Sequence, residues 1–103
     1  MTRPVLLNND ELPVVRSDKD DDNWTLVTTR RIVGCMEGLH HEQLFNQLED
    51  YVIGLPRSMS AEFGRFRTTD IHGVQKEFIT EAGTARIAFV DALRFLHRSV
   101  RNA

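Results

Sequence analysis

The sequence predicts a single α+β domain in which an antiparallel sheet is covered by one central amphipathic helix and one C-terminal helix. Three observations predict this fold class: short runs of β-branched and aromatic residues, single glycines between these runs, and two stretches whose apolar residues recur at helical spacing. A chain of 103 residues with 41% hydrophobic side chains can form one core of its own. We expect residues 1–23 to form an N-terminal strand and an acidic loop, and residues 24–103 to form the domain itself.

The N-terminal region predicts one strand and then a solvated segment. The strand is expected at residues 12–16, and the acidic tract after it carries Asp18, Asp20, Asp21 and Asp22. These carboxylates repel one another and have nothing apolar to bury, so we expect the tract to be a turn or loop in water.

The next two runs are the clearest strand signals in the chain. Residues 24–29 are all β-branched, aromatic or leucine and sort into two faces of a strand, and residues 32–36 form a second β-prone run after Arg30 and Arg31. Two interpretations stay open, a hairpin with a tight connection and one long bent strand. Gly38 ends this segment.

Residues 39–52 predict the central helix. Their apolar side chains fall at helical spacing, at Leu44, Phe45, Leu48, Tyr51 and Val52. No Ser, Thr, Asp or Asn caps the start, whereas Gly54 and Pro56 end the helix and residues 55–61 are expected to be a long loop.

The C-terminal part predicts strands and a final helix. Strands are expected at residues 63–71 and 74–80, and Glu81-Ala82-Gly83-Thr84 predicts a hairpin turn into a further strand at residues 85–89. The final helix is expected from Asp91, its N-cap, to Val100.

Charge and composition exclude several classes of function. A net charge of −2 and a sequence pI of about 6.0 lack the basic footprint of a protein that binds double-stranded nucleic acid. No run of about 18 apolar residues predicts a membrane span, and the first residues lack the order of a secretory signal. Cys35 is the only cysteine, so no internal disulfide can form, and we expect a cytoplasmic protein.

Two groups of residues resemble metal sites in part. Asp18, Asp20 and Asp22 match the first, third and fifth positions of an EF-hand loop. Asn23, however, stands at the sixth position in place of the required glycine, and Thr29 stands at the twelfth in place of the glutamate. The residue types that zinc prefers occur together at Cys35, Glu37, His40 and His41, without a second ligand pair at finger spacing. We expect no metal site.

No enzyme signature is found either. Cys35 lies in an apolar run, where a thiol is a small hydrophobe of low reactivity, although a nucleophilic Cys35 with His40 or His41 stays an alternative. Glycine-rich nucleotide motifs and Gly-x-Ser-x-Gly are absent from the sequence. We therefore expect no catalytic residue and no cofactor, and predict a protein that is not an enzyme.

Four arginines are the candidate contact residues for an anion or a protein partner: Arg30, Arg31, Arg65 and Arg67. Nearly all positive charge in this chain is guanidinium, which favours bidentate contacts with carboxylates or phosphates. The alternative is that these arginines pair within the protein, with acidic residues such as Glu37, Glu62, Asp70 or Glu77.

One motif supports a family resemblance. Trp24, Leu26, Thr28, Arg31 and Ile32 form a W-x-L-x-T-x-x-R-I pattern, followed by strands and a C-terminal helix. This order resembles the pleckstrin-homology-like (PH-like) barrels of small bacterial proteins, although the central helix departs from the simplest form of that fold. The resemblance implies an interaction module that binds lipid headgroups, proteins or a second copy of itself, and it assigns no ligand residue.

Our hypothesis is a non-enzymatic protein-interaction module that can form a homodimer. A second hypothesis is an inhibitor or immunity-type protein whose tract of Asp18, Asp20, Asp21 and Asp22 blocks a basic site on its partner. A third is an anion- or phosphate-binding module that uses the arginines.

Overall fold

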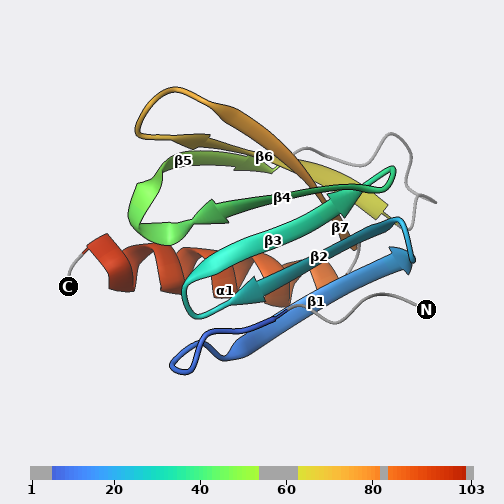
Figure 1. Cartoon of the computed structure of the whole chain (residues 1–103), viewed down its shortest axis with the longest axis horizontal. Helices are drawn as coiled ribbons and strands as arrows, with labels where there is room; N and C mark the ends of the chain where they lie inside the picture. The colour runs from blue at the N-terminus through green and yellow to red at the C-terminus, as the bar shows by residue number, and fades with distance from the viewer. Residues whose placement is uncertain (1–5, 54–62, 82–83, 102–103) are drawn as a thin grey trace.

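The computed structural model describes residues 6–53, 63–81 and 84–101. Within these ranges two antiparallel sheets precede one C-terminal helix, so the α+β class is confirmed (Figure 1). The first sheet has the strand order β1 (Pro13–Asp20), β2 (Asn23–Thr28), β3 (Arg31–Met36) and β4 (Leu39–Leu44). The second has the order β5 (Leu48–Ile53), β6 (Phe63–Asp70) and β7 (Gln75–Glu81). A short 3-10 helix, η1 (Phe45–Gln47), joins the sheets, and α1 (Thr84–Arg101) follows.

The main core lies between the first sheet and the elements packed against one of its faces. Figure 1 shows α1 crossing behind β1 to β3, and β7 contacts the same strands. The buried residues of this core come from both sheets, η1 and α1: Val27, Ile32, Phe45, Leu48, Phe66, Phe78, Phe89, Leu93 and Leu96. The Phe66 ring lies against two others of this set, with its centroid 5.1 Å from that of Phe78 and 5.2 Å from that of Phe89.

The first sheet is also apolar on its other face. Trp24 and Leu26 of β2 and Val33 and Cys35 of β3 form a second buried cluster there. The guanidinium carbon of Arg16 lies 5.0 Å from the centroid of the Trp24 ring, a distance typical of a cation–π contact. Because both faces of β2 and β3 are buried, β-branched, aromatic and aliphatic side chains follow one another along these strands, which explains their clear signal in the sequence.

The first two strand predictions need one correction. β1 is longer than expected and includes Asp18 and Asp20, because the strand pairs with β2 as far as Asp20 opposite Asn23. The carboxylates remain exposed as predicted, but half of the tract lies on a strand and not on a loop. Residues 24–36 form a hairpin, the first of the two interpretations, with Thr29 and Arg30 between β2 and β3.

The predicted central helix over residues 39–52 is wrong. This segment forms β4, the turn of η1 and β5. Phe45 and Leu48 enter the core from either end of η1, while Val52 is 60% exposed, so the apolar spacing that predicted a helical face reflects a chain reversal. Pairing of β4 with β3 and of β5 with β6 satisfies the backbone of both halves, and this tertiary pairing overrides the local pattern.

The C-terminal predictions are partly right. β6 and β7 agree with the two expected strands, and the turn between them contains Gly73, which has a φ of +81°. The predicted strand at residues 85–89 is wrong because α1 begins at Thr84, and Asp91 lies inside the helix instead of capping it. Phe89, Leu93 and Leu96 share the buried helical face, which a strand at residues 85–89 would not provide. The expected loop at 55–61 and Ala82-Gly83 lie outside the described residues.

The part of the chain that the structure describes contains no helix that is both long enough and apolar enough to span a bilayer.

Candidate functional site

A cleft of about 710 Å³ lies where four segments of the protein meet. Its walls come from the N-terminal residues, the β2–β3 turn, the end of β4 with η1, and the C-terminal half of α1. Leu44, Leu96 and Val100 supply its apolar side chains. The polar lining residues are Asn8, Asp10, Thr29, Arg30, Arg31, Asn46 and Ser99. A cleft that combines aliphatic side chains with a few polar groups is the usual form of a binding site.

One wall of the cleft is the N-terminal strap, residues 6–12, which precedes β1. Its backbone is joined to the β2–β3 turn by the Thr29 amide, which donates to the Leu12 carbonyl at 2.9 Å, and by the Leu12 amide, which donates to Thr29 Oγ1 at 3.1 Å. The strap also closes on itself, since the Glu11 amide donates to the Asn8 carbonyl at 3.0 Å.

Glu11 joins the strap to the sheet through a buried ion pair. Its side chain is 0% exposed, and Arg31 donates to both carboxylate oxygens, from Nε at 2.8 Å and from Nη2 at 3.2 Å. The Thr28 hydroxyl donates to Glu11 Oε2 at 2.6 Å, and the Asn8 amide donates to Oε1 at 3.1 Å. Each oxygen therefore has two donors, so this buried carboxylate is fully solvated by protein groups.

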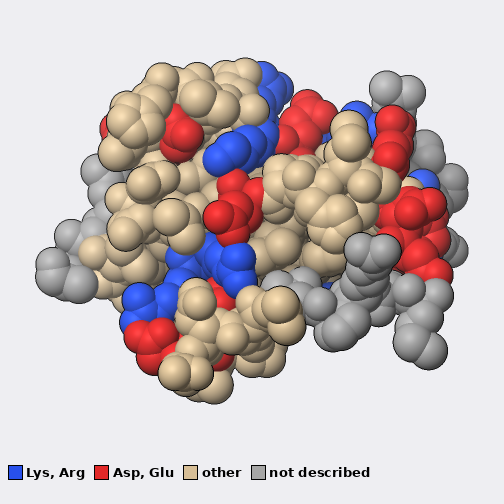
Figure 2. Space-filling view, in the orientation of Figure 1, with Lys and Arg blue, Asp and Glu red and all other residues tan. Residues whose placement is uncertain are grey.

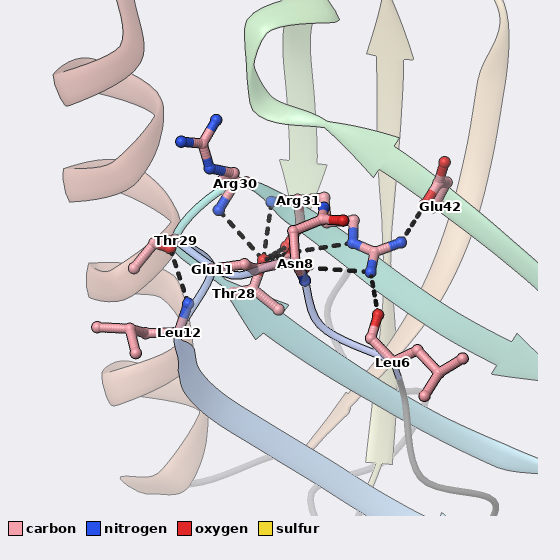
Figure 3. A network of polar contacts seen from close by, with 9 residues as sticks. All are labelled: Leu6, Asn8, Glu11, Leu12, Thr28, Thr29, Arg30, Arg31 and Glu42. Carbon is pink, nitrogen blue, oxygen red and sulfur yellow. Dashed lines mark hydrogen bonds and ion pairs between the residues drawn. The ribbon is translucent and has the colours of Figure 1, made fainter.

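Arg31 in turn donates hydrogen bonds to several acceptors on the strap and on β4. Its Nη1 donates to Glu42 on β4 at 2.6 Å and its Nη2 donates to the Leu6 carbonyl at 2.9 Å, in addition to the bonds to Glu11. Figure 3 shows the Arg31 guanidinium between Glu11 and Glu42, while the side chain of Arg30 points away from this network. In this arrangement Arg31 holds the strap, and these contacts account for four of its five N–H donors.

The pKa values of the pair reflect these contacts. Burial raises the pKa of the Glu11 carboxyl, but the hydrogen bonds from Arg31, Thr28 and Asn8 together outweigh burial, and its pKa lies below the ordinary value. The hydrogen bonds to Glu11 and then to Glu42 raise the pKa of Arg31. Both groups are therefore charged at neutral pH.

Arg30 is the more accessible of the two adjacent arginines. It forms an ion pair with Asp10 on the strap, and the side chains are 54% and 64% exposed. An exposed pair of this kind contributes little to stability and exchanges readily with another charged group. Of the two arginines that line the cleft, Arg30 is therefore the one whose guanidinium is exposed.

Arg65 and Arg67 belong to a different surface. They lie on β6 of the second sheet, both exposed, and Arg65 Nη1 is 3.5 Å from Glu77 Oε2 on β7. Arg67 is paired in register with the same Glu77. The two arginine pairs thus have separate carboxylate partners, and no contact between the pairs is found among the described residues.

The acidic tract lies at another place, on the tip of the β1–β2 hairpin beside the β3–β4 turn. The amide of Gly38 donates to the Asp22 carbonyl at 3.1 Å, and the amide of Glu37 donates to Asn23 Oδ1 at 3.0 Å, so the two tips are joined. Asp20 Oδ1 accepts from the Asn23 side chain and the Asp22 amide, and these bonds lower the pKa of Asp20. Figure 2 shows acidic side chains gathered at this end of the molecule.

The residues that suggested metal or thiol chemistry lie in different surroundings. Cys35 is 1% exposed in the second apolar cluster, and burial raises the pKa of its thiol. His40 contacts the Trp24 ring, whereas His41 lies on the other face of the sheet, bonded to the Glu77 carbonyl and beside Phe78. In the described ranges, no three His, Cys, Asp or Glu side chains are grouped so as to hold a metal ion.

Comparison of the chain with protein-family models, curated proteins and solved structures finds no match.

Sequence reasoning identified Arg30 and Arg31 but missed their surroundings. Glu11 precedes Arg31 by 20 residues and Glu42 follows it by 11, and no local spacing relates them. The one available signal was the W-x-L-x-T-x-x-R-I pattern, whose Thr28 and Arg31 both contact Glu11.

Proposed function

We propose that this protein is a non-enzymatic protein-interaction module of PH-like type and that its contact surface is the cleft beside α1. The observation that carries the proposal is the combination, within one cleft, of aliphatic side chains with an accessible guanidinium, that of Arg30. A partner segment can place an apolar side chain against Leu96 and Val100 and a charged group beside Arg30. Burial of apolar area then supplies affinity, and the ion pair supplies orientation.

The PH-like part of the proposal has two supports. The W-x-L-x-T-x-x-R-I pattern spans β2, the β2–β3 turn and the start of β3, and a single C-terminal helix packs on the sheets. The absence of a central helix removes the one departure from the simplest form of that fold that the sequence had suggested.

Site-specific crosslinking tests the proposal. A photoreactive residue is placed at Ser99 or Asn46, which line the cleft, and at the exposed Gln75 of β7 as a matched control outside it. We expect one adduct of defined mass from both cleft positions in the native cell, none from Gln75, and loss of the adduct in an Arg30→Glu variant. Equal labelling from all three positions, or none from the cleft, would refute the proposal.

The mass of the adduct also tests self-association. An adduct of twice the chain mass identifies a homodimer through the cleft, and any other mass identifies a different protein.

We propose the cytoplasm as the compartment, since the buried Cys35 is a free thiol.

The acidic end favours a second candidate function, an inhibitor or immunity-type protein. Asp21, Asp22 and Glu37 are exposed on two tips whose backbones are joined, so their charges are presented on an ordered surface, and the exposed Asp18 nearby on β1 is paired with Arg16. The triple variant Asp18→Asn, Asp21→Asn and Asp22→Asn keeps the turn residue Asp20. We expect this variant to bind a basic partner more weakly and with a flatter salt dependence; unchanged binding would exclude the candidate.

Free phosphate or another small anion is a weaker candidate for the cleft. Arg30 and Arg31 face three carboxylates, those of Asp10, Glu11 and Glu42, so the closed network carries one net negative charge. Such a network does not attract a small anion.

A further inference from the structure

The strap carries two of the three carboxylates that pair with the arginines of the cleft. Asp10 pairs with Arg30, and Glu11 pairs with Arg31. If residues 6–12 leave, Glu42 alone remains beside the two guanidinium groups. The local charge then changes from one net negative to one net positive, so displacement of the strap turns the cleft into a site for a carboxylate.

The strap is held by polar contacts, with little apolar burial. Leu6 is 88% exposed, Leu7 36% and Leu12 64%, so its leucines contribute little to attachment. Its attachment depends on the Glu11 ion pair, the Asp10 ion pair and the two hydrogen bonds between Leu12 and Thr29. Segments with few buried apolar contacts can open locally at a free energy below that of global unfolding.

The position vacated by Glu11 has the donors that a carboxylate requires. Arg31 Nε and the Thr28 hydroxyl lie within 2.8 Å and 2.6 Å of Glu11 Oε2, and Arg31 Nη2 lies 3.2 Å from Oε1. A guanidinium fork with a hydroxyl beside it recognises a carboxylate in a defined orientation. The remaining carboxylate, Glu42, repels a phosphate dianion more than a singly charged group.

We propose that the strap is a built-in competitor, and that the partner of the cleft is an acidic protein segment whose carboxylate replaces Glu11 between Arg31 and Thr28. This inference rests on the proposed function of the cleft as a protein-contact surface and names the chemistry of the partner. It also makes binding autoinhibited, because the strap must leave before the acidic segment enters. The apparent affinity is reduced by the fraction of molecules in which the strap is closed.

Hydrogen exchange on the unmodified protein tests whether the strap opens. The amides of Leu12 and Thr29 form the bonds between strap and turn. We expect these amides to exchange at least ten times faster than the slowest amides of the first sheet, at a rate that does not follow global unfolding in low denaturant. Exchange of Leu12 and Thr29 only through global unfolding would overturn the proposal.

Peptide binding tests what replaces the strap. The probe is the strap's own sequence, Leu-Leu-Asn-Asn-Asp-Glu-Leu, added to the full-length variant Asp10→Asn with Glu11→Gln. We expect at least tenfold tighter binding to this variant than to the unmodified protein, with shifts of the Arg31 Nε–H and Thr28 resonances. Equal binding to both proteins would overturn the proposal, as would no binding by the folded variant.

Three controls define the ligand class. A peptide with Asn and Gln in place of Asp and Glu should not bind, and Glu42→Gln, which alters the other partner of Arg31, should leave the strap closed. Inorganic phosphate that displaces the peptide at equal concentration would contradict the choice of a carboxylate. These readouts do not depend on the crosslinking experiment: adducts at Ser99 with a strap that never opens refute only the competitor, whereas absent adducts refute the proposed function.

Discussion

Gly34 of β3 lies against the ring of Phe78 on β7, so closely that a Cβ at position 34 would be 2.5 Å from Phe78 Cδ1 and 3.0 Å from Cε1. Phe78 is fully buried in the main core, and the side chain of His41, in register with Gly34 on β4, lies beside the same ring. This contact brings the two sheets together. The lack of a side chain at Gly34 is therefore a packing requirement between sheets, since the backbone there needs no positive φ.

Gly34→Ala is expected to destabilise the protein by about 1–3 kcal/mol, the usual cost of an added methyl group in a packed core. Urea denaturation measures the change in the free energy of unfolding. In a double-mutant cycle, the free energy lost on Gly34→Ala should be smaller when Phe78 is replaced by Leu than when Phe78 is present. Strictly additive losses would contradict the contact as the cause.

Glu11→Gln is expected to lower the free energy of unfolding at neutral pH by about 3 kcal/mol, because it breaks a buried ion pair and leaves Arg31 with one carboxylate. Since folding lowers the pKa of Glu11, the ionised carboxylate stabilises the fold above its unfolded value of about 4.5. This stabilisation is lost as the pH falls from there through the lower folded pKa.

The measurement is the difference in unfolding free energy between the unmodified protein and Glu11→Gln across the acid range. The difference should shrink as the pH falls below about 4.5, while the acid titrations of Asp20 and Asp70 occur in both proteins and cancel. A difference that stays constant down to acid pH would show that the charge of Glu11 is not the source of the stabilisation.

Phe89→Ala and Phe95→Ala form a matched pair on α1. Phe89 is 1% exposed and Phe95 is 70% exposed, so we expect losses of about 3–5 kcal/mol at Phe89 and about 0.5 kcal/mol or less at Phe95. Thermal or urea unfolding measures both. Similar losses at the two positions would contradict the helical register that begins at Thr84.

Cys35 is expected to resist alkylation in the native protein, because it is buried and because burial raises the pKa of its thiol. Iodoacetamide labelling followed by mass spectrometry should proceed only at the rate of unfolding and become fast in urea. Rapid native labelling would return the nucleophile hypothesis to consideration.

The two wrong predictions, a helix at residues 39–52 and a strand at residues 85–89, have a common physical cause. Residues 39–52 and 85–89 both carry patterns that are consistent with more than one structure, since a buried turn between strands also places apolar residues three or four positions apart. Phe45, the first residue of η1, and Leu48, which follows η1, enter one core, and Phe89 lies on the helical face of Leu93 and Leu96. Only the partners of each segment decide which structure forms.

The sequence by itself determined the α+β class, the β-prone runs on either side of Arg30 and Arg31, and the exposure of the acidic tract, because these depend on local residue types and short-range alternation. The tertiary structure decided the chain reversal at η1, the early start of α1, and the placing of Glu11 and Glu42 around Arg31. Those depend on residues far apart in the chain, whose pairing follows from the packing of two sheets and a helix around one core.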